Sequence, residues 1–149
     1  MILIIDELEF LLYGGGERMN EHFIILETLK HPVRCCCPGQ GHEYTVEFKQ
    51  GDIWFVTRER KYIDCLGWYF LIAFNNEYQF YIHMEDIGNL YRKGIMCSIL
   101  DLELKINYLN SKVNEALDEQ DRKAFLSYTS ELNDVQSIKG KMTYTPVYN

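Results

Sequence analysis

Apolar and polar side chains alternate with a period of two between residues 42 and 87. The alternation is clearest in Tyr44–Phe48 and Tyr78–Ile82, where every second side chain is aromatic or β-branched. This period is typical of strands with one buried face. Asn75-Asn76 suits a tight hairpin turn, because asparagine tolerates positive φ. The pattern predicts an antiparallel β-meander or small barrel of four strands, at Tyr44–Phe48, Ile53–Thr57, Gly67–Phe74 and Glu77–His83.

Three short polar segments connect or close these strands in the prediction. Gln50–Asp52 is a turn, Arg58–Lys61 is a charged loop, and Met84–Ile87 is a short turn after the last strand.

After Gly94 the apolar period becomes that of a helix. Apolar residues recur at spacings of three and four, at Ile99, Leu102, Ile106, Leu109, Val113 and Ala116. We expect Leu104, Tyr108 and Leu117 to widen this stripe, so that the helix faces the core.

A second helical stripe follows at Ala124, Phe125, Tyr128, Leu132 and Val135. Asp118 is predicted to cap this helix, with Asp121 three residues later, as in a capping box. The two stripes predict an antiparallel helical hairpin ending near Gly140. The near-heptad spacing also suits pairing between chains, so a homodimer through the helices stays open.

The predicted fold class is therefore α+β. A small β-domain covers residues 19–93, a helical hairpin 94–140, and a tail 141–149. Residues 1–18 are a doubtful leader, because Gly14–Arg18 can be the translation of a purine-rich ribosome-binding site before a native start at Met19. The alternative is a short amphipathic helix that ends at a glycine hinge.

Composition narrows the class of protein further. The 149 residues are 47% hydrophobic and 25% charged, which excludes a wholly disordered chain. No run approaches the roughly 20 apolar residues of a transmembrane helix, and no export signal precedes the first acidic residues. We therefore expect a cytoplasmic protein that does not bind a membrane. The net charge of −7 disfavours nucleic acid as a partner.

The five cysteines are an odd number, and three of them are consecutive. Cys35 and Cys37 can point the same way, and with His42 or His31 they form a weak candidate zinc site. The alternative is a turn region of small, partly buried residues. No other cofactor is predicted.

The chain shows no sequence motif of a known catalytic site. His83 lies near Glu85 and Asp86, but such a group is usually an exposed polar surface. A cysteine-dependent enzyme would need Cys37 or Cys65 beside His42 or His83. We therefore predict that the protein is not an enzyme.

The segment Val113–Leu132 resembles the IDEAL domain of Firmicute proteins. The residues of the family's motif fall on Ala116, Leu117, Asp118, Asp121, Phe125, Thr129 and Leu132. The segment departs from the motif at Val113-Asn114, which replaces Ile-Asp, and at Tyr128, which replaces Leu. The resemblance implies a small protein of a Gram-positive bacterium or its phage, with a docking or regulatory hairpin and no catalysis.

A second resemblance, over residues 44–87, is to a Src-homology-type small barrel. It rests on Phe48–Asp52 as a diverging turn and on Gly67-Trp68-Tyr69, where that family has its tryptophan pair. The motifs that hold proline-rich peptides in that family are missing, so peptide binding does not carry over.

These features predict a non-catalytic interaction or regulatory protein that docks a protein partner through the hairpin or the aromatic sheet. The candidate partner-binding residues are Trp68, Tyr69, Asp118, Asp121, Arg122, Phe125 and Tyr128. The first alternative is a nucleic-acid-associated transcriptional regulator that uses Arg58–Lys61. The second is a cysteine-dependent or zinc-binding protein.

Overall fold

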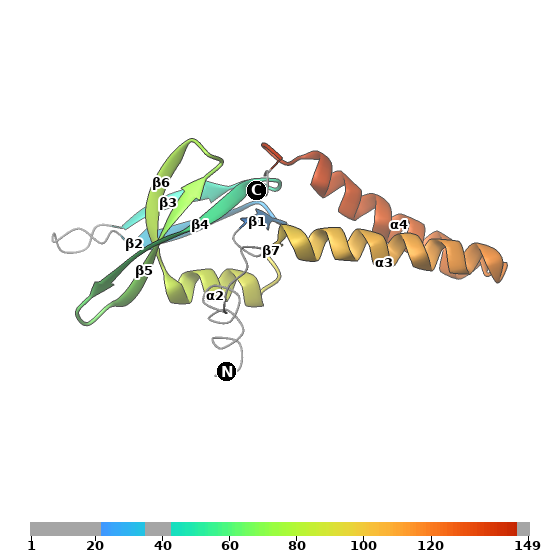
Figure 1. Ribbon diagram of the computed structural model, residues 1–149, viewed down its shortest axis with the longest axis horizontal. Helices are drawn as coiled ribbons and strands as arrows, with labels where there is room; N and C mark the ends of the chain where they lie inside the picture. The colour runs from blue at the N-terminus through green and yellow to red at the C-terminus, as the bar shows by residue number, and fades with distance from the viewer. Residues whose placement is uncertain (1–21, 35–42, 146–149) are drawn as a thin grey trace.

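The computed structural model describes residues 22–34 and 43–145 (Figure 1). The strands are β1 (His22–Ile25), β2 (Leu29–Arg34), β3 (Glu43–Phe48), β4 (Ile53–Ile63), β5 (Gly67–Phe74), β6 (Tyr78–His83) and β7 (Met96–Ser98). The helices are α2 (Met84–Arg92), α3 (Ile99–Asp118) and α4 (Arg122–Gly140). The chain has the predicted α+β class, with antiparallel sheets followed by a helical hairpin.

The strands form two antiparallel sheets rather than a closed barrel. The larger sheet has the order β6-β5-β4-β1-β7, and β2 and β3 form a separate ribbon. The predicted meander is therefore present in β4, β5 and β6. The expectation that β3 opens this meander is wrong, because β3 pairs with β2 from Leu29↔Phe48 onward. The alternating pattern identified β3 as a strand but carried no information about its neighbour.

Two predicted connections are parts of regular elements instead. The Arg58–Lys61 segment is not a loop, because it continues β4 beyond a register shift between Val56 and Arg60. The hydroxyl of Thr57 donates to the Leu71 carbonyl and accepts from the Glu59 N–H, which holds this bulge. The expected Met84–Ile87 turn is the first turn of α2.

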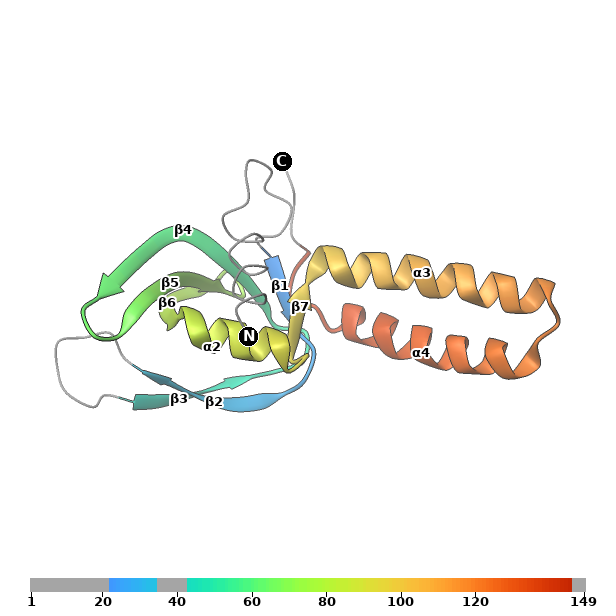
Figure 2. The ribbon, with the colours of Figure 1, turned by 90° about the horizontal axis from the view of Figure 1, so that it is seen from below.

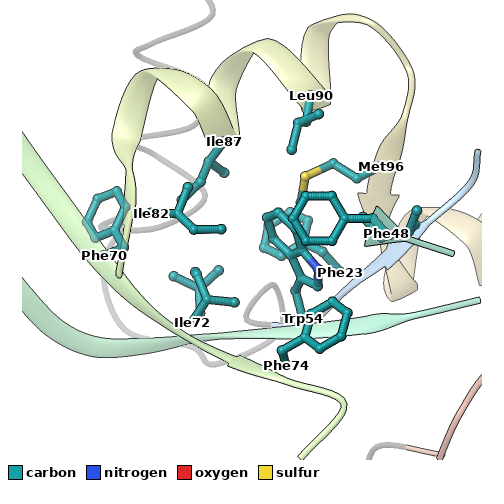
Figure 3. Packing of buried hydrophobic residues seen from close by; sticks show 12 residues of the cluster. Phe23, Phe48, Trp54, Phe70, Ile72, Phe74, Ile82, Ile87, Leu90 and Met96 are labelled. Atoms are coloured by element: carbon teal, nitrogen blue, oxygen red, sulfur yellow. The ribbon is translucent and has the colours of Figure 1, made fainter. Parts of the chain in front are cut away.

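One hydrophobic core fills the space between the larger sheet, α2 and the β2–β3 ribbon. Figure 3 shows Ile87 and Leu90 of α2 pointing toward Trp54 and the other buried rings. Phe48 of the ribbon meets Trp54 of β4 edge-to-face, with the ring centroids 4.7 Å apart. The aromatic excess of the sequence is thus largely a property of this core.

A second cluster joins the opposite face of the sheet to the base of the hairpin. Ile24 of β1 and Ile53 of β4 pack there with Ile99 and Leu102 of α3 and with Val135 of α4. Both faces of β1 are therefore buried. Beyond this base, α3 and α4 run side by side away from the sheet (Figures 1 and 2).

The residues after α4 return to the sheet. The N–H of Thr143 donates to the Gly51 carbonyl, and its hydroxyl bonds to Oδ1 of Asn75. Lys141 Nζ donates to Oε1 of Gln50 at 2.6 Å. The hairpin is therefore attached to the sheet at both ends, through β7 before α3 and through residues 141–143 after α4.

Candidate functional site

The hairpin is held together by an apolar seam with ion pairs on its flanks. The facing residues include Leu102, Ile106 and Leu109 of α3 and Leu132 and Val135 of α4, all buried. Ion pairs join Lys105 to Glu131 at 3.5 Å and Glu103 to Lys139 at 2.6 Å. These side chains are about half exposed, so each pair contributes at most about 1 kcal/mol. The buried seam therefore supplies most of the stability of the hairpin, and the ion pairs add little.

The free end of the hairpin is a short capped connection. Asp121 is the N-cap of α4, and its Oδ1 accepts the N–H of Ala124 at 3.1 Å. Asp118 is the last residue of α3, so the prediction that it caps the second helix is wrong. Gln120 takes a positive φ of 55° between the two helices, and the N-cap of α4 lies three residues later than expected.

The predicted hairpin residues divide into exposed and packed ones. Asp118, Asp121 and Arg122 are exposed around the free end, and Phe125 is half-buried beside them. Tyr128 is half-buried and packs against the second core cluster. Tyr128 is therefore mainly a packing residue of the seam.

Two exposed leucines at the free end were missed as candidate site residues. Leu117 near the end of α3 and Leu126 near the start of α4 are each 55% exposed. Leu117 is in the last turn of α3 and Leu126 is in the second turn of α4, so both lie near the connection between the helices. Leu126 lies away from the apolar stripe of α4, a signal that was readable in the sequence. We call Leu117 and Leu126, with their neighbours Asp118, Asp121, Arg122 and Phe125, the tip patch.

The outer side of α3 is also apolar. Leu104 and Tyr108 are 56% and 55% exposed, and Leu100 is 36% exposed. The expectation that Leu104, Tyr108 and Leu117 widen the core stripe is therefore wrong. A helix in a two-helix hairpin has one neighbour along most of its length, and that neighbour covers a single face.

Aromatic side chains gather at the end of the sheet farthest from the hairpin. Tyr62 and Trp68 are directly opposite each other in β4 and β5, and their rings meet edge-to-face at 5.2 Å. Both are exposed, whereas Tyr69 is fully buried. Tyr69 is therefore a core residue and is not available to a partner. The guanidinium of Arg60 lies over the Phe70 ring at 5.2 Å.

His83 has a structural role in the fold. Its Nδ1 accepts the N–H of Glu85 as the N-cap of α2, and its Nε2 bonds to the Leu66 carbonyl. Since Nδ1 accepts a hydrogen bond, the proton of the neutral ring is on Nε2. Both nitrogens are thus occupied by backbone groups. His83 is therefore a half-buried helix cap, whereas Glu85 beside it is exposed as expected.

The candidate metal and thiol residues fall mostly beyond the described ranges. Cys35, Cys37 and His42 lie outside the described residues, as do the leader 1–18 and Met19. His31 lies in β2, with Nε2 3.9 Å from Oδ2 of Asp86. Within residues 22–34 and 43–145, no three His, Cys, Asp or Glu side chains are grouped for a metal ion. The zinc site stays a prediction.

The family comparison matches the hairpin. Residues 102–132 match the IDEAL domain. The matched segment runs from α3 through the free end into α4, so it contains the whole tip patch and confirms the resemblance seen in the sequence. Neither the curated proteins nor the solved structures include a match to the chain. No described helix has both the length and the apolar character needed to cross a lipid bilayer.

Proposed function

We propose that this protein is a non-catalytic interaction protein that docks a protein partner through the tip patch of its IDEAL hairpin. The observation that carries the proposal is the exposure of Leu117 and Leu126 at the free end of a projecting hairpin. Burying the exposed half of each leucine against a partner stabilises a complex by about 1 kcal/mol per side chain.

The surroundings of the two leucines support this use. Asp118, Asp121 and Arg122 are also exposed at this end of the hairpin, so apolar and charged side chains occur together there. Many protein–protein interfaces have this arrangement. The N-cap at Asp121 and the buried seam below it fix the helices before binding, so little conformational entropy is lost on docking.

A regulatory role follows from the same features. A fixed docking surface without a reacting group changes its partner by tethering it or by covering one of its surfaces. The IDEAL match supports this proposal, because it lies on the segment that forms the surface.

A pull-down with the full chain tests the proposal. Leu117→Glu/Leu126→Glu places two charges in the proposed contact, and we expect the retained partner to fall at least about tenfold. Leu66→Glu is the matched control, because Leu66 is 44% exposed between β4 and β5, at the other end of the molecule. Loss of binding in the tip variant and not in L66E supports the proposal.

The same experiment separates the remaining alternatives. Equal retention of the partner by the tip variant and the parent contradicts the proposal. Loss of binding with Trp68→Ala alone assigns docking to the aromatic end of the sheet. Salt-dependent retention of nucleic acid, reduced by Arg58→Ala and Lys61→Ala, supports the transcriptional regulator instead.

A further inference from the structure

The outer side of α3 carries an apolar stripe diametrically opposite its buried seam. Leu100, Leu104 and Tyr108 are spaced four residues apart, and all three are exposed. At 3.6 residues per turn, the mean direction of this stripe differs by about 170° from that of the buried residues of α3. The stripe therefore faces away from α4, and α4 cannot cover it.

The charged side chains of α3 beside the stripe are only partly paired within the described residues. The charged residues of α3 up to Glu115 are Asp101, Glu103, Lys105, Lys112 and Glu115. Glu103 and Lys105 pair with α4, and Lys112 Nζ pairs with Glu115 Oε2 at 3.0 Å. In the described part of the chain, no ion pair includes the exposed carboxylate of Asp101. Asp101 and Lys112 lie on the same flank of the stripe.

Two copies of the stripe and its neighbouring charges complement each other when the two α3 helices lie antiparallel. Two copies of α3 that cross at residue 106 place Leu104 opposite Tyr108 of the second copy. The same register places Leu100 beside the aliphatic stem of Lys112. Because residues 101 and 112 are then about 1.5 Å apart along the axis, each Asp101 faces Lys112 of the other copy. Two-fold symmetry repeats every contact. The dimer interface therefore has an apolar contact and an ion pair at each of its two ends.

We infer that the occupant of this stripe is a second copy of the chain, paired antiparallel through α3. The inference does not depend on the function proposed for the tip patch, which uses different residues. Three side chains and a lysine stem bury less than the roughly 800 Å² per partner of a standard interface. The dimer is therefore weak and forms in the upper micromolar range.

Sedimentation velocity of the full chain from about 10 µM to 1 mM tests the inference. The average mass of the parent rises from 17.7 kDa toward twice that value. Leu104→Asp keeps the chain monomeric throughout. Leu126→Asp, an equally exposed leucine in the tip patch, leaves the dissociation constant unchanged.

Charge reversal gives the sharper test of the register. Asp101→Lys and Lys112→Asp each place like charges together twice, and each weakens the dimer about tenfold. The double variant D101K/K112D restores the dissociation constant to within about threefold of the parent. Circular dichroism of each variant verifies that the helices remain formed.

Three results would overturn the inference. They are a parent that stays monomeric to 1 mM, a dimer that survives L104D, and a double reversal no tighter than either single one. Since recovery in the double variant cannot come from helix stability alone, it separates the intermolecular ion pair from a purely structural effect.

Discussion

Cys97 illustrates how a side chain's surroundings set its chemistry. The thiol lies at the junction of β7 and α3, packed against the second core cluster. Burial raises its pKa to about 12, and the nearby carboxylate of Asp101 adds to the shift. A thiol held in its neutral form is a poor nucleophile, so Cys97 behaves as a small apolar residue.

This shift predicts a loss of stability at alkaline pH. The folded chain holds the Cys97 proton more tightly than the unfolded chain, whose thiol has the ordinary pKa of about 9.0. The contribution is complete below pH 9 and is lost as the pH rises toward 12. Between pH 9 and 11, the free energy of unfolding should therefore fall by about 1 kcal/mol per pH unit more in the parent than in Cys97→Ala. Urea denaturation of both chains at these pH values checks this, and parallel slopes would contradict it.

His83 shows why a residue-scale prediction from sequence can identify a side chain and mistake its role. The neighbouring carboxylates suggested a polar surface with acid–base potential. The structure uses both ring nitrogens for backbone groups, one within α2 and one in the turn before β5. The second contact joins residues 17 positions apart, so local sequence contains no sign of it.

At the scale of elements, the attachment of the hairpin to the sheet depends on Gly51. Its φ is +97°, and an added Cβ would lie 2.2 Å from the Lys141 carbonyl oxygen. Only glycine therefore allows the chain after α4 to reach Asn75 through Thr143.

Gly51→Ala should detach this segment and lower the free energy of unfolding by about 1–3 kcal/mol. The control is Gly140→Ala, because a Cβ there meets nothing within 4 Å and alanine favours a helix. Urea denaturation measures both variants, and hydrogen exchange at Met142 and Thr143 reports the detachment. Equal stability of G51A and the parent would contradict this account of the junction.

Elements with a clear local period were predictable, and those defined by distant contacts were not. The β4–β6 meander and the two long helices follow from alternation and from spacings of three and four. β1 shows no alternation, because Phe23, Ile24 and Ile25 are all buried between two clusters. β7 is three residues long and exists through its pairing with β1.

The same limit applies to the candidate site. The IDEAL motif located the free end of the hairpin, because Asp121 and Phe125 are part of a local pattern. Leu104 and Leu117 were assigned to the core, because hydropathy does not show whether a helix has one neighbour or two. Their exposure is a property of the tertiary arrangement.

At the scale of the whole molecule, the hairpin carries two exposed surfaces outside the sheet domain, the outer stripe of α3 and the tip patch. The sheet and α2 enclose the aromatic core, whereas α3 and α4 extend beyond it (Figure 2). The seam and the returning segment 141–143 hold the hairpin to the sheet domain. Because the stripe and the tip patch share no residue, pairing along α3 and docking at the tip can be tested with separate variants.

The most direct test of the proposed docking is site-specific photo-crosslinking in cells of the organism that carries the gene. A photoreactive phenylalanine analogue is placed at Leu126 in one chain and at Leu66 in the control chain. We predict a discrete crosslinked protein, other than a second copy of the chain, with the probe at residue 126 and none at residue 66. No crosslink at residue 126, or the same products from both positions, would contradict docking through the tip of the hairpin.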